Sequence, residues 1–161
     1  MKSIVIVFIV FLFCYIGYLL KLKYKNQKTY LEKVRDFLNY YQSNMVVFKN
    51  NIFEIINSYK MEQKNKNAKQ VNIFKNINKL YKLDENVMEK WIYDSNVAMC
   101  IVNYFNNIGN QNFDFEKEKL NDFLKYINTM INISNTELKN KGDLIFKLLI
   151  ALGLIVAILI W

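Results

Sequence analysis

Carboxylate pairs are the residues of this sequence that come closest to a catalytic pattern. They occur as Asp84/Glu85, Asp114/Glu116 and Glu116/Glu118. Each pair stands at the expected start of a helix, where capping and solvation explain acidic side chains without acid–base chemistry. The chain contains no His, which is the commonest general base and the commonest metal ligand. We therefore expect no enzyme activity, no metal site and no cofactor.

The sequence also lacks the short motifs that hold nucleotides or activate a nucleophile, such as G-x-x-x-x-G-K-[ST], G-x-G-x-x-G, G-x-S-x-G and H-E-x-x-H. Its two Cys, Cys14 and Cys100, fit neither a disulfide framework nor a zinc site. The net charge is +8, but Arg35 is the single Arg among 22 basic residues. A solvated basic surface explains this charge, so we expect no nucleic-acid partner and no small-molecule substrate.

Two long apolar stretches, residues 3–20 and 144–161, enclose a polar middle segment. As a helix with a rise of about 1.5 Å per residue, the second stretch would be about 27 Å long, close to the hydrocarbon core of a bilayer. No small-residue cleavage site follows the first stretch, so we interpret it as an uncleaved membrane helix. The alternative is a signal peptide, which would leave an external protein with a C-terminal anchor.

Lysines flank the inner ends of both apolar stretches. They are Lys21, Lys23, Lys25, Lys139, Lys141 and Lys147. Lys and Arg near membrane helices collect on the cytosolic side, so this distribution predicts a cytosolic domain over residues 21–143. Both termini would lie on the far side. The sequence thus predicts a two-pass protein of the cell membrane with the lipid bilayer as a partner.

The polar middle is helical in pattern and predicts an all-α bundle. The chain has no Pro and four Gly, so long helices are the default. Apolar residues recur in steps of three and four at Leu31, Val34, Leu38, Tyr41, Met45, Phe48, Ile52 and Ile55. This spacing predicts a helix facing the core, with an intermolecular coiled coil as the alternative. Asn50-Asn51 is expected to divide it into two helices.

Further along, the pattern predicts a loop at residues 61–70 and helices at 71–83, from Asp84 to Gly109, and from Asp114 toward Gly142. Asp84 is the expected N-cap of the second of these helices, and Trp91 is expected in its core-facing side. Gly109 is expected to end that helix in a left-handed conformation. Asp114 and Glu116 suit the positive end of the next helix dipole.

Short motifs in the last third of the chain resemble a known family. They are Phe105-Asn106-Asn107-Ile108-Gly109, Lys141-Gly142, and the apolar run from Leu148 to Ile155 that contains Leu152-Gly153. With them, the chain resembles stage III sporulation protein AB of endospore-forming bacteria. That family has the same order of an N-terminal membrane helix, a helical cytosolic domain with a Trp at the place of Trp91, and a C-terminal apolar helix. An acidic pair and a Thr-Pro pair of the family are absent here.

The resemblance implies a non-enzymatic part of a secretion-like channel complex between mother cell and forespore, in the mother-cell membrane. The cytosolic domain would be similar to that of platform protein F of type II secretion. Its partners would be a secretion-type ATPase and other proteins of the same complex. On this basis Arg35, Leu38 and Tyr41 are a candidate partner interface. The alternatives are the tail-anchored external protein above and a small toxin or holin-like membrane protein.

Overall fold

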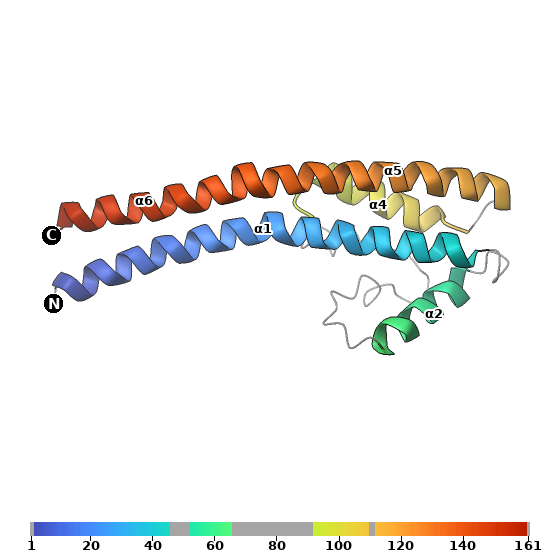
Figure 1. Ribbon diagram of the computed structural model, residues 1–161, viewed down its shortest axis with the longest axis horizontal. Coiled ribbons are helices and arrows are strands. Elements are labelled where there is room, and N and C mark those ends of the chain that lie inside the picture. Colours follow the sequence, from blue (N-terminus) through green and yellow to red (C-terminus); the bar gives the residue numbers. More distant parts are fainter. Residues whose placement is uncertain (1, 46–51, 66–91, 110–111, 161) are drawn as a thin grey trace. The chain divides into compact units, whose positions relative to one another are not determined.

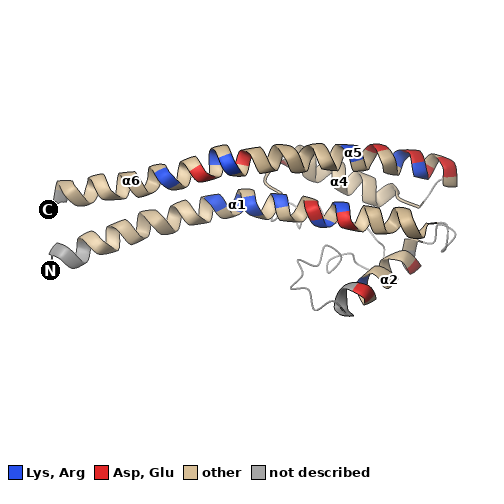
Figure 2. Ribbon diagram, viewed as in Figure 1, with Lys and Arg blue, Asp and Glu red and all other residues tan. Residues whose placement is uncertain are grey.

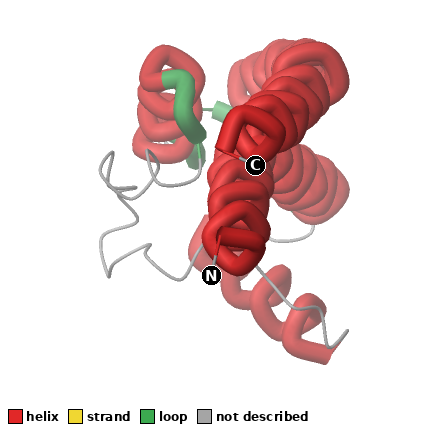
Figure 3. Tube along the Cα trace, turned by 90° about the vertical axis from the view of Figure 1, so that its left-hand side faces the viewer, coloured by secondary structure: helices red, strands yellow, loops and turns green. Residues whose placement is uncertain are grey.

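The computed structural model describes residues 2–45, 52–65, 92–109 and 112–160. Every regular element in these ranges is helical, which confirms the predicted all-α fold (Figures 1 and 3). The elements are α1 (Lys2–Asn44), α2 (Ile52–Asn65), α4 (Ser95–Asn107), α5 (Phe113–Glu137), the π-helical turn η1 (Leu138–Gly142) and α6 (Asp143–Ile160).

The chain divides into two compact units. One comprises Met1–Lys28 and Asn132–Trp161, and we call it the hairpin unit. The other comprises Thr29–Ile131, and we call it the core unit. The polar segments 21–28 and 132–143, which the sequence assigns to the cytosolic domain, therefore group with the apolar ends.

The core unit is built on the predicted seam of α1. Its buried members are Leu31, Val34, Leu38, Tyr41, Met45 and, from α2, Ile55. Phe37, also fully buried, places its ring 5.3 Å from that of Tyr59 on α2 and 5.6 Å from that of Phe105 on α4. Buried residues of α5, including Leu120 and Ile127, belong to the same cluster. The seam is thus a core-facing stripe, as predicted, and Phe48 lies outside the described residues.

α4, which covers the second part of the helix predicted from Asp84 to Gly109, begins at Ser95. Asp94 is the N-cap of α4, and its side chain accepts hydrogen bonds from the backbone N–H groups of Asn96 and Val97. Residues 92–94 are not helical, so a continuous helix through them is wrong. A short carboxylate side chain accepts hydrogen bonds from the free N–H groups of the first helical turn and so stabilises the start of a helix. Asp94 has the same side chain as Asp84 and can therefore form this cap. Asp84 itself, the helix 71–83 and Trp91 lie outside the described residues.

Two helix ends match the sequence pattern and one does not. Gly109 has a φ of 80°, the left-handed conformation expected after α4. α1 ends at Asn44 and α2 begins at Ile52, so the seam residues lie on two helices, while the predicted break at Asn50-Asn51 falls outside the described residues. The predicted loop at 61–70 is wrong over its first residues, because α2 continues to Asn65. Its polar residues are good helix formers, so the absence of apolar residues does not end the helix.

A π turn joins α5 to α6, so the predicted long helix does lead into the last apolar stretch. The backbone N–H of Asp143 bonds to the carbonyl of Leu138. Ser134 and Gly142, eight residues apart, are both buried against the middle of α1, residues 21–27. Eight residues of α-helix make about 2.2 turns, which would rotate these two positions apart. The π turn holds more residues per turn than an α-helix, so it offsets this extra rotation and keeps both residues on the same face.

Candidate functional site

The hairpin unit brings two sequence-distant apolar helices side by side. A Cβ placed on Gly17 of α1 would lie 3.1 Å from the Phe146 ring and 3.4 Å from Leu149 of α6. A Cβ placed on Gly153 of α6 would lie 3.1 Å from Cβ of Phe13. Phe13 contacts Gly153, whereas Gly17, further along α1, contacts Phe146, which is earlier in α6. The two helices are therefore antiparallel (Figure 1). Glycine at such points lets two backbones approach closely, as in packed membrane helices.

Polar groups hold together the other end of the hairpin unit. Lys21 Nζ lies 2.7 Å from a carboxylate oxygen of Asp143, and the Lys21 ammonium keeps the pKa of that carboxyl below its usual range. Buried Gln27 donates a hydrogen bond to the Ser134 hydroxyl at 3.1 Å. Lys28 Nζ donates to the amide oxygen of Asn135 at 3.0 Å. The unit therefore changes along its length from close apolar packing to specific polar pairing.

Most apolar side chains of the hairpin unit point outward. Two helical ranges, Ile6–Asn44 and Phe113–Leu159, each contain a window long and apolar enough to cross a membrane, of which 6% and 11% are buried. The core helix of a soluble protein would bury most of such a window. Large exposed side chains include Phe8, Phe11, Leu148, Ile155 and Ile158. Both helices are thus long and apolar enough to cross a membrane, and most of each apolar window is exposed.

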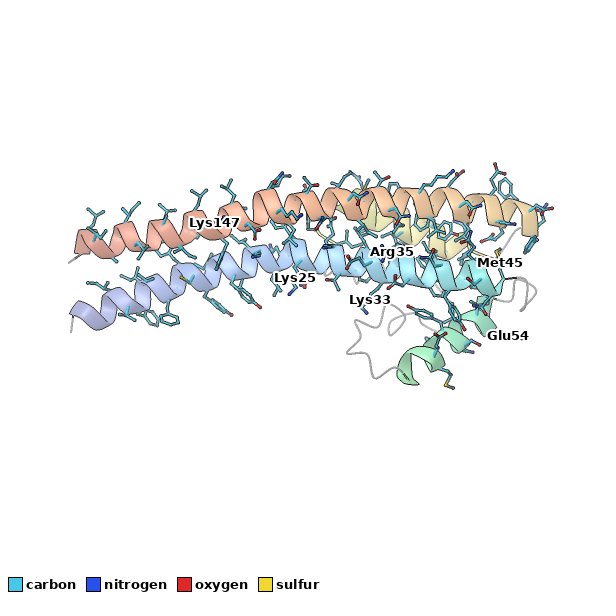
Figure 4. The ribbon with its side chains drawn as sticks, viewed as in Figure 1. Lys25, Lys33, Arg35, Met45, Glu54 and Lys147 are labelled. Atoms are coloured by element: carbon cyan, nitrogen blue, oxygen red, sulfur yellow. The ribbon has the colours of Figure 1, made fainter. Side chains whose placement is uncertain are left out.

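The predicted membrane-flanking lysines all belong to the hairpin unit. Figure 2 shows basic residues of α1 and of the η1–α6 region gathered at the same end of the apolar helices. Lys23, Lys25, Lys139, Lys141 and Lys147 are exposed, whereas Lys21 is half-buried in its ion pair. Lys25 and Lys147, from the two helices, are labelled in Figure 4. The structure thus assembles one basic zone from two segments more than a hundred residues apart.

The three residues of the predicted partner interface are placed differently from one another. Leu38 and Tyr41 are fully buried in the core unit. A soluble partner could reach their side chains only if the core opened, so these two are core residues. The Arg35 side chain is 37% exposed and lies 3.2 Å from Asp36. Of the predicted set, only Arg35 remains available for a surface contact.

Glu116 is a residue whose environment the sequence did not predict. It stands in the first turn of α5, where solvation was expected, yet it is 2% exposed. Its carboxylate accepts a hydrogen bond of 3.1 Å from the backbone N–H of Gly109. Burial raises the pKa of Glu116, and the Gly109 N–H and Lys119 lower it in part. Glu116 thus fastens the turn after α4 to the start of α5.

Two tyrosine hydroxyls share this buried region. The hydroxyl oxygens of Tyr41 and Tyr104 are shielded from solvent, and the Tyr41 hydroxyl interacts with the Glu116 carboxylate. Burial, followed by the charge of Glu116, raises the pKa of both phenols. The Tyr104 ring is stacked on Phe123 with 3.8 Å between centroids. Tyr104, Phe123 and Glu116 also line an open cavity of about 430 Å³. Among the described residues, no three His, Cys, Asp or Glu side chains gather as metal ligands would.

The described structure defines an all-α protein in which a helical core unit is linked to a pair of long, exposed apolar helices. No family model, curated protein or solved structure matches the chain.

Proposed function

We propose that the chain is a two-pass membrane protein whose domain, residues 21–143, faces the cytosol. Residues 3–20 and 144–161 would cross the bilayer as the paired helices of the hairpin unit. The observation that carries the proposal is the gathering of lysines from both helices at one end of an exposed apolar pair (Figure 2). Because Lys near membrane helices collects on the cytosolic side, this end would be cytosolic.

The packing of the two helices supports an uncleaved first stretch. Gly17 and Gly153 each make close contacts with the partner helix, through Phe146 and Phe13 respectively. A signal peptide is removed from the mature protein, and its removal would take away every one of these contacts. The core unit likewise favours a folded domain over a small toxin or holin, because such a protein needs no buried core of this size.

We further propose a structural and coupling role without catalysis. A domain tied to the bilayer at both ends stays at the membrane surface, where it can meet a soluble partner and membrane partners together. The resemblance of residues 105–109 and 141–155 to stage III sporulation protein AB supports a specific version of this role. In that version the chain belongs to the channel complex between mother cell and forespore and contacts a secretion-type ATPase, with Arg35 as a candidate contact.

The topology can be tested with a single reactive cysteine in the full-length protein. Asn57 is exposed on α2, so Asn57→Cys in a Cys14→Ser/Cys100→Ser background gives one accessible thiol. We expect a membrane-impermeant maleimide to label it only after cells are permeabilised. A matched cysteine appended after Trp161 should be labelled in intact cells. Labelling of Asn57→Cys in intact cells would overturn the cytosolic placement.

The role can be tested in the organism that encodes the chain. If the sporulation assignment is right, deletion of the gene should lower the number of heat-resistant spores with no effect on vegetative growth. The neighbouring genes should encode a secretion-type ATPase, and the tagged full-length protein should retain that ATPase after detergent extraction. Normal spore numbers in the deletion strain would contradict the sporulation role and leave the membrane topology standing.

A further inference from the structure

The exposed lysines of the hairpin unit form a defined surface. We call Lys23, Lys25, Lys139, Lys141 and Lys147 the lysine belt, and all five are exposed. The Lys21–Asp143 ion pair and the contact of Gly142 with Tyr24 bring the two contributing segments to the same level. Figure 4 shows Lys25 on α1 and Lys147 on α6. The belt therefore lies at the boundary between polar pairing and apolar packing.

The belt carries more positive charge than its own unit neutralises. Residues 2–28 and 132–160 contain two acidic side chains, Glu137 and Asp143. Glu137 accepts from Lys141 at 2.7 Å, and Asp143 pairs with Lys21 at 2.7 Å. Lys147 acts on the Asp143 carboxylate without a direct ion pair, and Lys23, Lys25 and Lys139 make no ion pair with a described residue. Four exposed ammonium groups are thus left for a negatively charged partner outside the unit.

The position of the belt selects the kind of partner. Lys147 stands four residues into α6, beside the exposed apolar residues Leu144 and Leu148. A lysine at such a depth lays its apolar stem along the helix and raises its ammonium to the headgroup level. Phosphodiester groups of lipids occupy that level, and clusters of four to eight lysines beside membrane helices attract anionic lipids.

We propose that the lysine belt binds the phosphate headgroups of anionic phospholipids in the cytosolic leaflet. This inference rests on the proposed two-pass topology, which brings the belt to that leaflet. Nucleic acid fits the belt less well, because the belt is bordered by exposed apolar side chains and contains no Arg.

The experiment reconstitutes the full-length protein in vesicles of phosphatidylcholine and measures its preference for spin-labelled phosphatidylglycerol over spin-labelled phosphatidylcholine. We expect a preference of about fivefold in 0.1 M salt, the factor that about one lysine near an anionic surface supplies. The variant Lys23→Gln/Lys25→Gln/Lys139→Gln/Lys147→Gln should lower it to near one. A variant with equal charge change in the core unit, Lys33→Gln/Lys60→Gln/Lys117→Gln/Lys125→Gln, should keep the wild-type value.

Insertion is measured on the same samples by resistance to extraction at alkaline pH. Protein that is extracted contradicts the two-pass topology. Protein that resists extraction but shows no preference for phosphatidylglycerol, or an equal loss in both variants, overturns the lysine belt as a lipid site. Inorganic phosphate should reduce the preference no more than sodium chloride of equal ionic strength. A greater reduction would identify the belt as a site for free phosphate and overturn the lipid assignment.

Discussion

The hairpin unit and the core unit use apolar residues in opposite ways. Phe37 in the core unit is fully buried among rings from three helices, whereas Phe11 in the hairpin unit is 72% exposed. Burial of apolar surface from water therefore stabilises the core unit. In the proposed topology the hairpin unit lies in lipid, which is itself apolar, so burial from water would not hold its two helices together. We expect this unit to depend on close packing at glycine and on polar pairs.

The largest difference should come from the same substitution in each unit. Phe37→Ala should lower the free energy of unfolding of the core unit by about 3–5 kcal/mol, because it removes a large buried ring and leaves a cavity. Urea unfolding of the full chain in detergent, followed by near-ultraviolet circular dichroism, measures this change. Phe11→Ala is the matched control and should leave the transition unchanged. Equal effects of the two variants would refute the claim that the core unit and the hairpin unit use apolar residues differently.

A smaller change in the core unit tests the buried carboxylate. Glu116→Ala removes the acceptor of the Gly109 N–H, and the unpaired group should cost about 1–3 kcal/mol of unfolding free energy. Glu116→Gln keeps an acceptor and should lose less. The same urea unfolding in detergent, compared between the two variants at neutral pH, measures the difference. Equal losses in both would mean that the hydrogen bond to Gly109 is not what matters.

The pH dependence of the same pair follows from the raised pKa of Glu116. The folded protein retains this proton at pH values where the unfolded chain has lost it. The contribution of Glu116 to stability is therefore complete below its ordinary pKa of 4.5 and declines as pH rises through the folded pKa. Wild type should accordingly lose stability relative to Glu116→Gln between pH 4 and pH 7. A constant difference between them would contradict the burial of this carboxyl.

In the hairpin unit, a larger residue at a glycine contact should separate the helices. Gly17→Leu forces atoms into the space of Phe146 and Leu149, and such overpacking costs about 1–3 kcal/mol. Spin labels at Phe8→Cys and Ile158→Cys, both exposed, report the distance between the two helices during unfolding in sodium dodecyl sulfate. Leu148→Ala, on the exposed side, is the control. A hairpin unaffected by Gly17→Leu would show that glycine contacts do not hold it.

The smallest expected effect concerns the polar end of the hairpin unit. Gln27→Leu removes the hydrogen bond to Ser134, and interhelical hydrogen bonds in membrane proteins contribute about 0.6 kcal/mol on average. The same spin-label distance should change at a slightly lower detergent fraction. The double variant Gln27→Leu/Ser134→Ala should recover part of the loss, because neither polar group is then left unpaired. A loss as large as that of Gly17→Leu would mean that polar pairing dominates this unit.

Periodic features of the chain were predictable from sequence, and features that depend on non-periodic contacts were not. The seam from Leu31 to Met45 and the left-handed Gly109 follow from local spacing and backbone geometry. The start of α4 at Asp94 was not predicted because Asp84 and Asp94 are equivalent candidates for a helix cap in the local sequence. Glu116 was missed because a carboxylate in the first turn of a helix usually faces water, and its partner Gly109 lies across a turn.

The candidate site divides in the same way. The lysines near both apolar stretches were visible in the sequence, because residue type and position alone predict them to flank membrane helices. The lysines of the two segments come to lie at the same end of the helix pair because α1 and α6 pack antiparallel and because Lys21 pairs with Asp143, more than a hundred residues away in the sequence. No local pattern encodes that register. Leu38 and Tyr41 were assigned to a partner interface but are buried in the core. The sequence could not separate the two roles, because apolar side chains suit an interface and a core equally well.

The most direct test of the proposed pairing of α1 and α6 in a membrane is a disulfide between them in native membranes. Phe13→Cys/Gly153→Cys, in a Cys14→Ser/Cys100→Ser background, brings together two Cβ positions that are 3.1 Å apart, a few tenths of an ångström below the usual disulfide range. We predict that mild oxidation cross-links most of the membrane-embedded full-length protein, seen as a mobility shift without reductant, and that Phe13→Cys/Leu154→Cys, one residue off the contact, does not. No cross-link in either pair, or a mature protein without its first apolar stretch, would contradict the account.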